Sequence, residues 1–186
     1  MSDAAARRGR RLVHDGRVVR LAVDTVAFPD GRLGEVELVE HPGAAAILPL
    51  LDPPTSDDPR VILLRQYRYA GGGYLLEVPA GTRDSPSEDW EACARRELEE
   101  ETGYAAGRLH ELGDILTTPG FTDERIRLYA AWDLRPGAAA ADADEYLECV
   151  PTTLSAALEK ALEGAIRDAK TLCTLFLADA WRDSLR

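Results

Sequence analysis

The sequence predicts an α+β fold in which helices flank a mixed β-sheet. Strand-like segments fill most of the chain before residue 81, a strongly helical segment lies between residues 85 and 102, and two amphipathic helices follow residue 150. Because these elements interleave without a strict βαβ repeat, a mixed sheet is favoured over a doubly wound parallel one. A chain of 186 residues fits one domain with room for a small appendage.

Several segments have the pattern of strands. Residues 11–40 alternate apolar and polar positions and turn at Asp15-Gly16 and at Pro29-Asp30-Gly31. The run GAAAILPLLD, residues 43–52, is continuously apolar, which is typical of a strand buried on both faces. Further strands are expected at residues 61–70, 108–120 and 125–134, and after a glycine break at 71–73 the stretch YLLEVPAG leads directly into the helix.

The helical segments carry boundary signals. Ser85 is predicted to be the N-cap of the first helix, with Pro86 at its first position and Glu88 completing a capping box. Gly103 is a natural left-handed stop at its other end. The amphipathic helices are expected at residues 152–165 and 168–186, the second capped by Asp168.

The first helix places three glutamates on the side that should pack against the protein. At about 100° per residue, Glu97, Glu100 and Glu101 fall on one face. That face also carries Trp90, Cys93 and Ala94, whereas the opposite face carries Glu91, Arg95 and Glu99. An acidic surface helix is the ordinary alternative for a glutamate-rich segment, but the inward position of the three glutamates argues against it.

Carboxylates on a buried side must be paired with cations or lose their charge. Arg96 can reach Glu100 at i+4, but one arginine cannot neutralise three acids. A hard divalent cation can, because Mg²⁺ prefers carboxylate oxygens and keeps waters that a substrate phosphate can displace. The segment therefore predicts a divalent-metal site.

Composition excludes several functional classes. A net charge of −11 argues against a nucleic-acid-binding surface, because affinity for phosphate comes from clustered lysine and arginine. No apolar run is long enough for a signal peptide or a transmembrane helix, so no membrane partner is expected. Three widely spaced cysteines, Cys93, Cys149 and Cys173, are interpreted as reduced core thiols of a cytoplasmic protein.

One set of fixed spacings spans the glutamate-rich segment. Its members are Gly81, Glu88, Arg96, Glu97, Leu98, Glu100, Glu101, Gly103 and Tyr104. This pattern resembles the Nudix box, G-x5-E-x7-R-E-U-x-E-E-x-G-U, in which U is aliphatic or aromatic. It departs from the box once, because six residues rather than five separate Gly81 from Glu88. An extra residue in the loop before the helix leaves the helix itself in register.

Three further stretches, LEVPAG before the box, TPGF after it and IRDAKTL near the C-terminus, are similar to the ADP-ribose pyrophosphatase branch of that family. Together with the RQYR strand, the resemblance covers roughly residues 17–180. It implies an α/β/α sandwich with a mixed sheet, formed by a Nudix hydrolase domain at residues 41–186. It also implies an N-terminal β-element, residues 1–40, that is exchanged between the protomers of a homodimer.

The resemblance implies a metal site that binds Mg²⁺, with Mn²⁺ as the alternative. Glu97 and Glu101 would be the central ligands, Glu100 would share a metal, and the Ala80 carbonyl would add a backbone oxygen. Arg96 would orient these glutamates. A plain ion pair on the helix surface is the other interpretation of Arg96.

The same resemblance suggests residues that hold substrate. Arg65 and Arg68 would bind phosphate, and Glu77 would accept from a donor on the base or ribose. Ordinary alternation along a strand is the competing explanation for the two arginines. Phe121 would pack on the substrate or anchor its loop.

The late acidic loop departs from the branch. An ungapped reading of residues 142–145 puts Glu145 at a metal-ligand position and Ala143 where a glutamate often acts as general base. Glu145 or Asp144 is therefore chosen as the base, with a box glutamate such as Glu97 or Glu100 as the alternative.

The expected reaction is Mg²⁺-dependent hydrolysis of ADP-ribose to AMP and ribose 5-phosphate. Two alternatives stay open at this point. The chain could hydrolyse another nucleoside diphosphate sugar such as GDP-mannose, or it could be a non-catalytic ADP-ribose sensor, as Ala143 suggests. The intact box glutamates weigh against the sensor.

Overall fold

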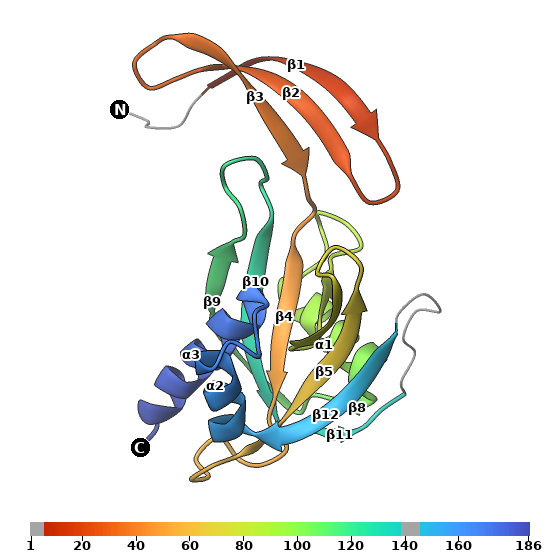
Figure 1. The fold of residues 1–186 in the computed structure, drawn as a ribbon, viewed down its shortest axis with the longest axis vertical. Helices are drawn as coiled ribbons and strands as arrows, with labels where there is room; N and C mark the ends of the chain where they lie inside the picture. The colour runs from red at the N-terminus through yellow and green to blue at the C-terminus, as the bar shows by residue number, and fades with distance from the viewer. Residues whose placement is uncertain (1–5, 139–145) are drawn as a thin grey trace. The chain divides into compact units, whose positions relative to one another are not determined.

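The computed structural model describes residues 6–138 and 146–186 (Figure 1). The chain divides into two compact units, which are described separately. The first unit contains the residues up to 42 together with residues 116–125, and the second contains residues 43–115 and 126–186. None of the helices in the described residues is long and apolar enough to cross a membrane.

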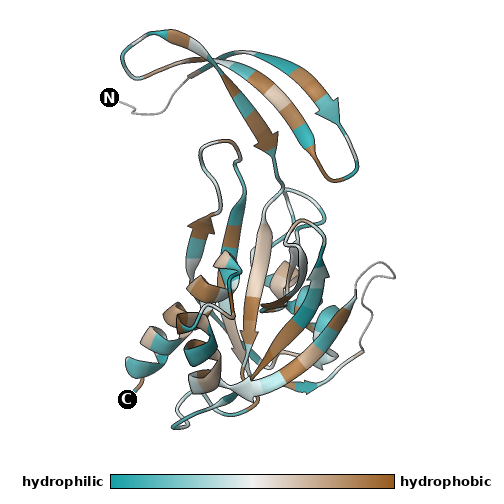
Figure 2. Cartoon of the chain, viewed as in Figure 1, coloured by the Kyte–Doolittle hydropathy of each residue, from teal (hydrophilic) through white to brown (hydrophobic). Residues whose placement is uncertain are grey.

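The first unit is built on an antiparallel sheet of order β1-β2-β3, formed by Ala6–Asp15, Arg20–Ala27 and Leu33–Glu40. The predicted turn before β3 is present, with Gly31 at a φ of 83°, where a glycine is favoured. Arg10 donates to Asp24 at 2.6 Å and also to Glu40, which ties the three strands together. Apolar and polar residues alternate along these strands (Figure 2), and several apolar side chains are exposed, among them Leu12, Val13 and Leu33.

A mixed sheet of order β7-β4-β10-β9 forms the centre of the second unit. Its strands are β4 (Ala44–Pro49), β7 (Ala80–Thr82), β9 (Arg108–Leu116) and β10 (Arg125–Trp132). Strand β4 pairs in parallel with β10 and antiparallel with β7, which confirms the predicted mixed sheet. Every residue of β4 is buried, as its continuous apolar run predicted.

A second sheet of order β12-β5-β6 completes the β-structure near the site. Its strands are β5 (Arg60–Arg68), β6 (Gly73–Glu77) and β12 (Leu147–Thr153), and all pairings are antiparallel. A short pair, β8 (Tyr104–Ala105) with β11 (Arg135–Pro136), follows the first helix.

Helices cover both faces of β4. Helix α1 (Trp90–Thr102) packs on the face of β4 that carries Ala45 and Ile47. Helix α3 (Ala169–Asp183) packs on the opposite face, in the cluster that contains Ala46 and Leu48, and α2 (Leu154–Leu162) packs on α3 and β12. Figure 1 shows α1 on one side of β4 and the other two helices on the opposite side. The α/β/α sandwich is therefore confirmed, with α1 on its own face of the sheet.

The structure adds one strand to those predicted and corrects the prediction for the cysteines. Strand β12 was not predicted, because LECVPTT is short, does not alternate and contains Pro151; its place at the sheet edge explains why the proline is tolerated. The cysteines are unbridged, but they are not all core thiols: Cys93 is buried, Cys173 is intermediate and Cys149 is exposed.

Candidate active site

Helix α1 begins later than the sequence predicted. Its N-cap is Asp89, whose carboxylate accepts from the backbone N–H groups of Glu91 and Ala92 at 3.0 and 3.1 Å. The expected capping box at Ser85 does not form, because Glu88 instead accepts from the backbone N–H of Asp84 at 2.6 Å. The predicted stop at Gly103 is confirmed, with a φ of 72° and its N–H donating to the Glu99 carbonyl. The box glutamates therefore lie on the last turns of a helix whose ends are both capped.

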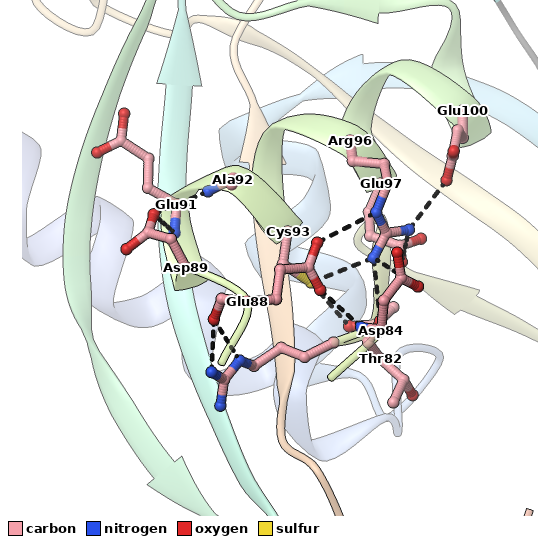
Figure 3. A network of polar contacts seen from close by, with 12 residues as sticks. Thr82, Asp84, Glu88, Asp89, Glu91, Ala92, Cys93, Arg96, Glu97 and Glu100 are labelled. Atoms are coloured by element: carbon pink, nitrogen blue, oxygen red, sulfur yellow. Dashed lines mark hydrogen bonds and ion pairs between the residues drawn. The ribbon is translucent and has the colours of Figure 1, made fainter. Parts of the chain in front are cut away.

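Arg96 lies at the centre of a cluster of carboxylates (Figure 3). Its Nη1 is 2.6 Å from Glu97 and 3.1 Å from Glu100, and its Nε is 3.4 Å from Glu88. Its Nη2 lies 3.6 Å from Asp84 and donates to the Thr82 carbonyl at 3.1 Å. The guanidinium thus joins the last residue of β7, the loop before α1 and the helix itself.

The other face of the cluster is the backbone of β7. Glu101 is buried, with 4% of its surface exposed, and accepts from the Ala80 N–H at 2.9 Å. A Cβ added to Gly81 would lie 2.0 to 2.2 Å from the carboxylate atoms of Glu97, so a larger residue at this position would displace that carboxylate. The backbone of Ala80 and Gly81 therefore lies directly against the carboxylates of Glu97 and Glu101.

The cluster has an excess of negative charge. Four carboxylates contact Arg96, which supplies one positive charge, and Glu101 lies beside the same strand. Burial disfavours the charged form of Arg96, but the charge of Glu97 and the hydrogen bonds that Arg96 donates to Glu88, Glu97 and Glu100 outweigh this effect, so the pKa of Arg96 lies above its ordinary value. The arginine therefore stays charged while it contacts four carboxylates.

These side chains have the chemistry of a site for a hard divalent cation, because they offer several carboxylate oxygens against a backbone strand. Within residues 6–138 and 146–186, however, no three histidine, cysteine or acidic side chains converge on one point as a formed cage. The donor set therefore fits the predicted metal in its chemistry, with the Arg96 contacts holding Glu97 and Glu100 in the arrangement seen.

Arg68 and Glu77 form a second ionic pair, on the face shared by alternate residues of β5 and β6. The pair is bidentate, with Nε and Nη2 of Arg68 at 3.1 and 3.0 Å from the two carboxylate oxygens of Glu77. Glu77 is 1% exposed. Burial opposes its ionisation, but the hydrogen bond from Arg68 and the charge of Lys170 outweigh this effect and hold the pKa of Glu77 below its ordinary value. Glu77 therefore pairs with two cationic side chains of the protein, Arg68 and Lys170, and its oxygens do not face solvent.

Arg65 does not share this environment. It lies three residues before Arg68 and so points to the opposite face of β5. There its guanidinium stacks on the Tyr74 ring at 3.8 Å and lies 3.9 Å from Glu148. The two arginines that the sequence grouped together are therefore separated by the sheet.

The remaining predicted site residues are elsewhere. Phe121 belongs to the first unit, where its carbonyl accepts from the Val39 N–H at 2.8 Å and its side chain is half exposed. Glu145, Asp144 and Ala143 lie outside the described residues, so their roles stay predictions.

Sequence reasoning missed the partners of the predicted residues. Lys170 contacts Glu77 at 2.5 Å, although 93 residues separate them. Lys170 lies in the IRDAKTL stretch, whose resemblance to the ADP-ribose pyrophosphatase branch is the one sequence signal for it. Asp84 contacts Arg96 from the loop that contains the extra residue of the box, and no fixed spacing marks it.

A model of the NUDIX domain matches residues 40–175. The chain belongs to the Nudix family. It is a Nudix hydrolase of the pyrophosphatase type, and members of this family generally use a divalent metal. The box helix and the carboxylate cluster described above both lie inside the matched region.

Relatives support the same placement. A methanol dehydrogenase activator from Bacillus methanolicus is 38% identical over 162 residues, covering 86% of this chain and 84% of the relative. An ADP-ribose pyrophosphatase from Bacillus subtilis is 35% identical over 161 residues, with the same shares covered. A GDP-mannose pyrophosphatase from Pectobacterium atrosepticum is 40% identical over 124 residues, covering 62% of this chain and 63% of the relative.

The fold is also that of a solved Nudix-type structure. The crystal structure of an ADP compounds hydrolase superposes with a TM-score of 0.81 and covers 97% of this chain and 95% of its own. Since the two sequences are only 24% identical, this likeness speaks for the fold alone.

Proposed function

We propose that this Nudix hydrolase cleaves the diphosphate bond of ADP-ribose with Mg²⁺, giving AMP and ribose 5-phosphate. The observation that carries the proposal is the carboxylate cluster of α1, which has several acids, one arginine and the backbone of β7 in contact. Several carboxylates gathered around one arginine repel one another, and a bound divalent cation would relieve this repulsion. The ADP-ribose pyrophosphatase among the relatives supports the substrate.

The metal would be held by Glu97, Glu100 and Glu101, with the Ala80 carbonyl as a backbone ligand. When bound, a divalent cation neutralises phosphate oxygens and lowers the pKa of the attacking water. Arg96 keeps Glu97 and Glu100 oriented through the contacts at 2.6 and 3.1 Å. Mn²⁺ carries the same charge and is the alternative metal for this site.

The substrate diphosphate would be held by Arg68. Its Nε and Nη2 are fixed by Glu77, and its side chain remains 40% exposed, so the free edge of the guanidinium is available to an anion. Phe121 and Arg65 remain predicted substrate contacts. Arg65 has the weaker support, because its guanidinium already contacts the Tyr74 ring and the Glu148 carboxylate.

The general base would be Glu145 or Asp144, with Glu100 as the alternative inside the box. A base removes a proton from the water that adds to phosphorus as the bridging P–O bond breaks, and loss of a base typically lowers the rate about 10²–10⁴-fold. If Glu145 is the base, Glu145→Gln lowers kcat by this factor and leaves substrate binding intact. If Glu145→Gln and Asp144→Asn both turn over normally, the base is a box glutamate.

A second substrate is favoured by a specific observation, because GDP-mannose pyrophosphatases are also among the relatives. In this alternative the same metal and phosphate groups act on a different base and sugar. The sensor alternative has less support, because a protein that only binds ADP-ribose does not need the charge repulsion of the α1 cluster.

The experiment is a panel of nucleoside diphosphate sugars incubated with the enzyme and Mg²⁺, with the products separated by chromatography. We expect ADP-ribose to be cleaved with the highest kcat/KM and to give AMP and ribose 5-phosphate. Higher kcat/KM for GDP-mannose would move the assignment to the second substrate. Tight binding of ADP-ribose without turnover would favour the sensor.

A further inference from the structure

The start of helix α3 is bonded to the end of strand β6. Asp168 caps the helix by accepting from the N–H and the hydroxyl of Thr171 at 3.0 and 2.6 Å. The Thr171 hydroxyl oxygen in turn accepts from the N–H of Val78 at 2.9 Å. The IRDAKTL stretch is thereby fixed to the backbone immediately after Glu77.

Lys170 extends this connection to the side chain of Glu77. Its Nζ is 2.5 Å from Glu77 Oε2 and 3.0 Å from Asp168 Oδ2, and its side chain is only 13% exposed. An ammonium with three donors suits this bridge between two carboxylates in a small space, where the planar fork of an arginine would need more room.

The contacts form a continuous row of four alternating charges: Asp168, Lys170, Glu77 and Arg68. The row is electrically neutral. Glu77 shares its negative charge between two cations, so Arg68 is only partly neutralised by it. Without Lys170 the three remaining groups would carry a net negative charge, and a buried Glu77 carboxylate would depend on Arg68 alone.

We propose that Lys170 is a positioning residue for substrate binding, acting on Arg68 through Glu77. The proposal rests on the proposed function, in which Arg68 holds the diphosphate. Lys170 fixes the carboxylate that holds two nitrogens of Arg68, and it keeps the row neutral so that an anionic substrate is attracted. Its loss weakens binding of the diphosphate and leaves the α1 cluster, where the bond is broken, unchanged.

The test compares Lys170→Met with Lys160→Met, a matched control at the other lysine of the chain, which is exposed on α2. For the nucleoside diphosphate sugar that the wild type cleaves best, we expect Lys170→Met to raise KM about tenfold or more. This is the size of a lost hydrogen bond to a charged group. We expect kcat to stay within about twofold, and Lys160→Met to match the wild type.

A double-mutant cycle separates positioning from a general loss of structure. In an Arg68→Gln background, Lys170→Met should raise KM by less than about twofold, because the residue through which Lys170 acts is already absent. An equal increase in KM in both backgrounds would overturn the proposal, as would a fall in kcat with KM unchanged. If Lys170→Met does not fold, Lys170→Gln replaces it, since glutamine keeps a donor to Glu77 but removes the charge.

A measurement without substrate distinguishes failure of this proposal from failure of the proposed function. The Nε–H resonance of Arg68 in ¹⁵N NMR, assigned by its loss in Arg68→Gln, should exchange with water at least about tenfold faster in Lys170→Met than in the wild type and in Lys160→Met. Unchanged exchange overturns the Lys170 proposal. A wild type that cleaves no nucleoside diphosphate sugar overturns the proposed function, whatever the exchange result.

Discussion

Two carboxylates that are largely buried, Glu77 and Glu97, differ in the number of cationic side chains that neutralise their charge. Glu77 has two cations in contact, and its local charge is balanced. Glu97 shares Arg96 with three other acids, Asp84, Glu88 and Glu100. The first arrangement is that of a structural ion pair, and for the second we propose a role in binding a divalent cation.

At the residue scale, Glu77→Gln should destabilise the protein at neutral pH. Removing one member of a buried ion pair costs about 3–5 kcal/mol, because the partners are left uncompensated. The pKa of Glu77 is held below its ordinary value of 4.5. The carboxylate therefore stabilises the fold fully above pH 4.5, and this contribution is lost as the pH falls through the lowered value. In urea unfolding measured from pH 8 to pH 3, the difference in the free energy of unfolding between wild type and variant should become smaller as the pH falls.

Glu91→Gln is the control for that measurement. Glu91 is exposed and pairs only with Arg95 in the described residues, at 2.7 Å across one helical turn, so its loss should cost well under about 1 kcal/mol. A Glu77→Gln variant as stable as Glu91→Gln at pH 7 would show that the charge row contributes nothing to the fold.

The roles that could be predicted from sequence are those that depend on nearby residues in the chain, such as helix caps and helical periodicity. Gly103 and Asp168 act at helix ends that the sequence itself marks, and Glu101 faces inward because helical periodicity puts it there. The contact between Lys170 and Glu77 could not be predicted, because it depends on how α3 packs beside β6 and no periodicity carries that information.

At the element scale, the sequence and the structure assign the N-cap of α1 to different residues, Ser85 and Asp89. Asp89→Ala should destabilise the protein by about 1 kcal/mol, because two backbone N–H groups of the first turn lose their acceptor. Ser85→Ala should have almost no effect, since the Ser85 hydroxyl contacts only the exposed Ser87 hydroxyl at 3.0 Å among the described residues. The midpoints of urea unfolding measure the stability lost in each variant. A larger loss for Ser85→Ala than for Asp89→Ala would show that Ser85, and not Asp89, caps the helix.

The same scale explains the errors in the predicted elements. Ser85 and Asp89 are both good N-caps, and the sequence alone gives no reason to prefer the later one; the reach of Glu88 back to Asp84 decides it. Strand β12 forms because β5 offers it an edge, although its own residues have weak strand character. Both errors arise where tertiary contacts override local preference.

At the scale of the whole molecule, we predict a homodimer that exchanges the β-element of residues 1–40. The sheet β1-β2-β3 leaves apolar side chains such as Leu12 and Leu33 exposed, and three strands of this kind bury little surface by themselves. Light scattering at micromolar concentration should give twice the mass of the 20.3 kDa chain. Deleting residues 1–40 should abolish the dimer and weaken substrate binding; a fully active monomer would refute the exchange.

The central claim is that the inward glutamates of α1 bind a divalent cation. Mn²⁺ titration followed by electron paramagnetic resonance tests it without turnover, because bound Mn²⁺ loses its free-ion signal. We expect Glu101→Gln to weaken Mn²⁺ binding by at least about tenfold, since an amide is a poorer ligand and even the loss of an outer partner costs 10- to 100-fold. Glu91→Gln, which removes the same charge from the opposite face of the helix, should bind Mn²⁺ like the wild type. Equal affinity of Glu101→Gln and the wild type would contradict the account.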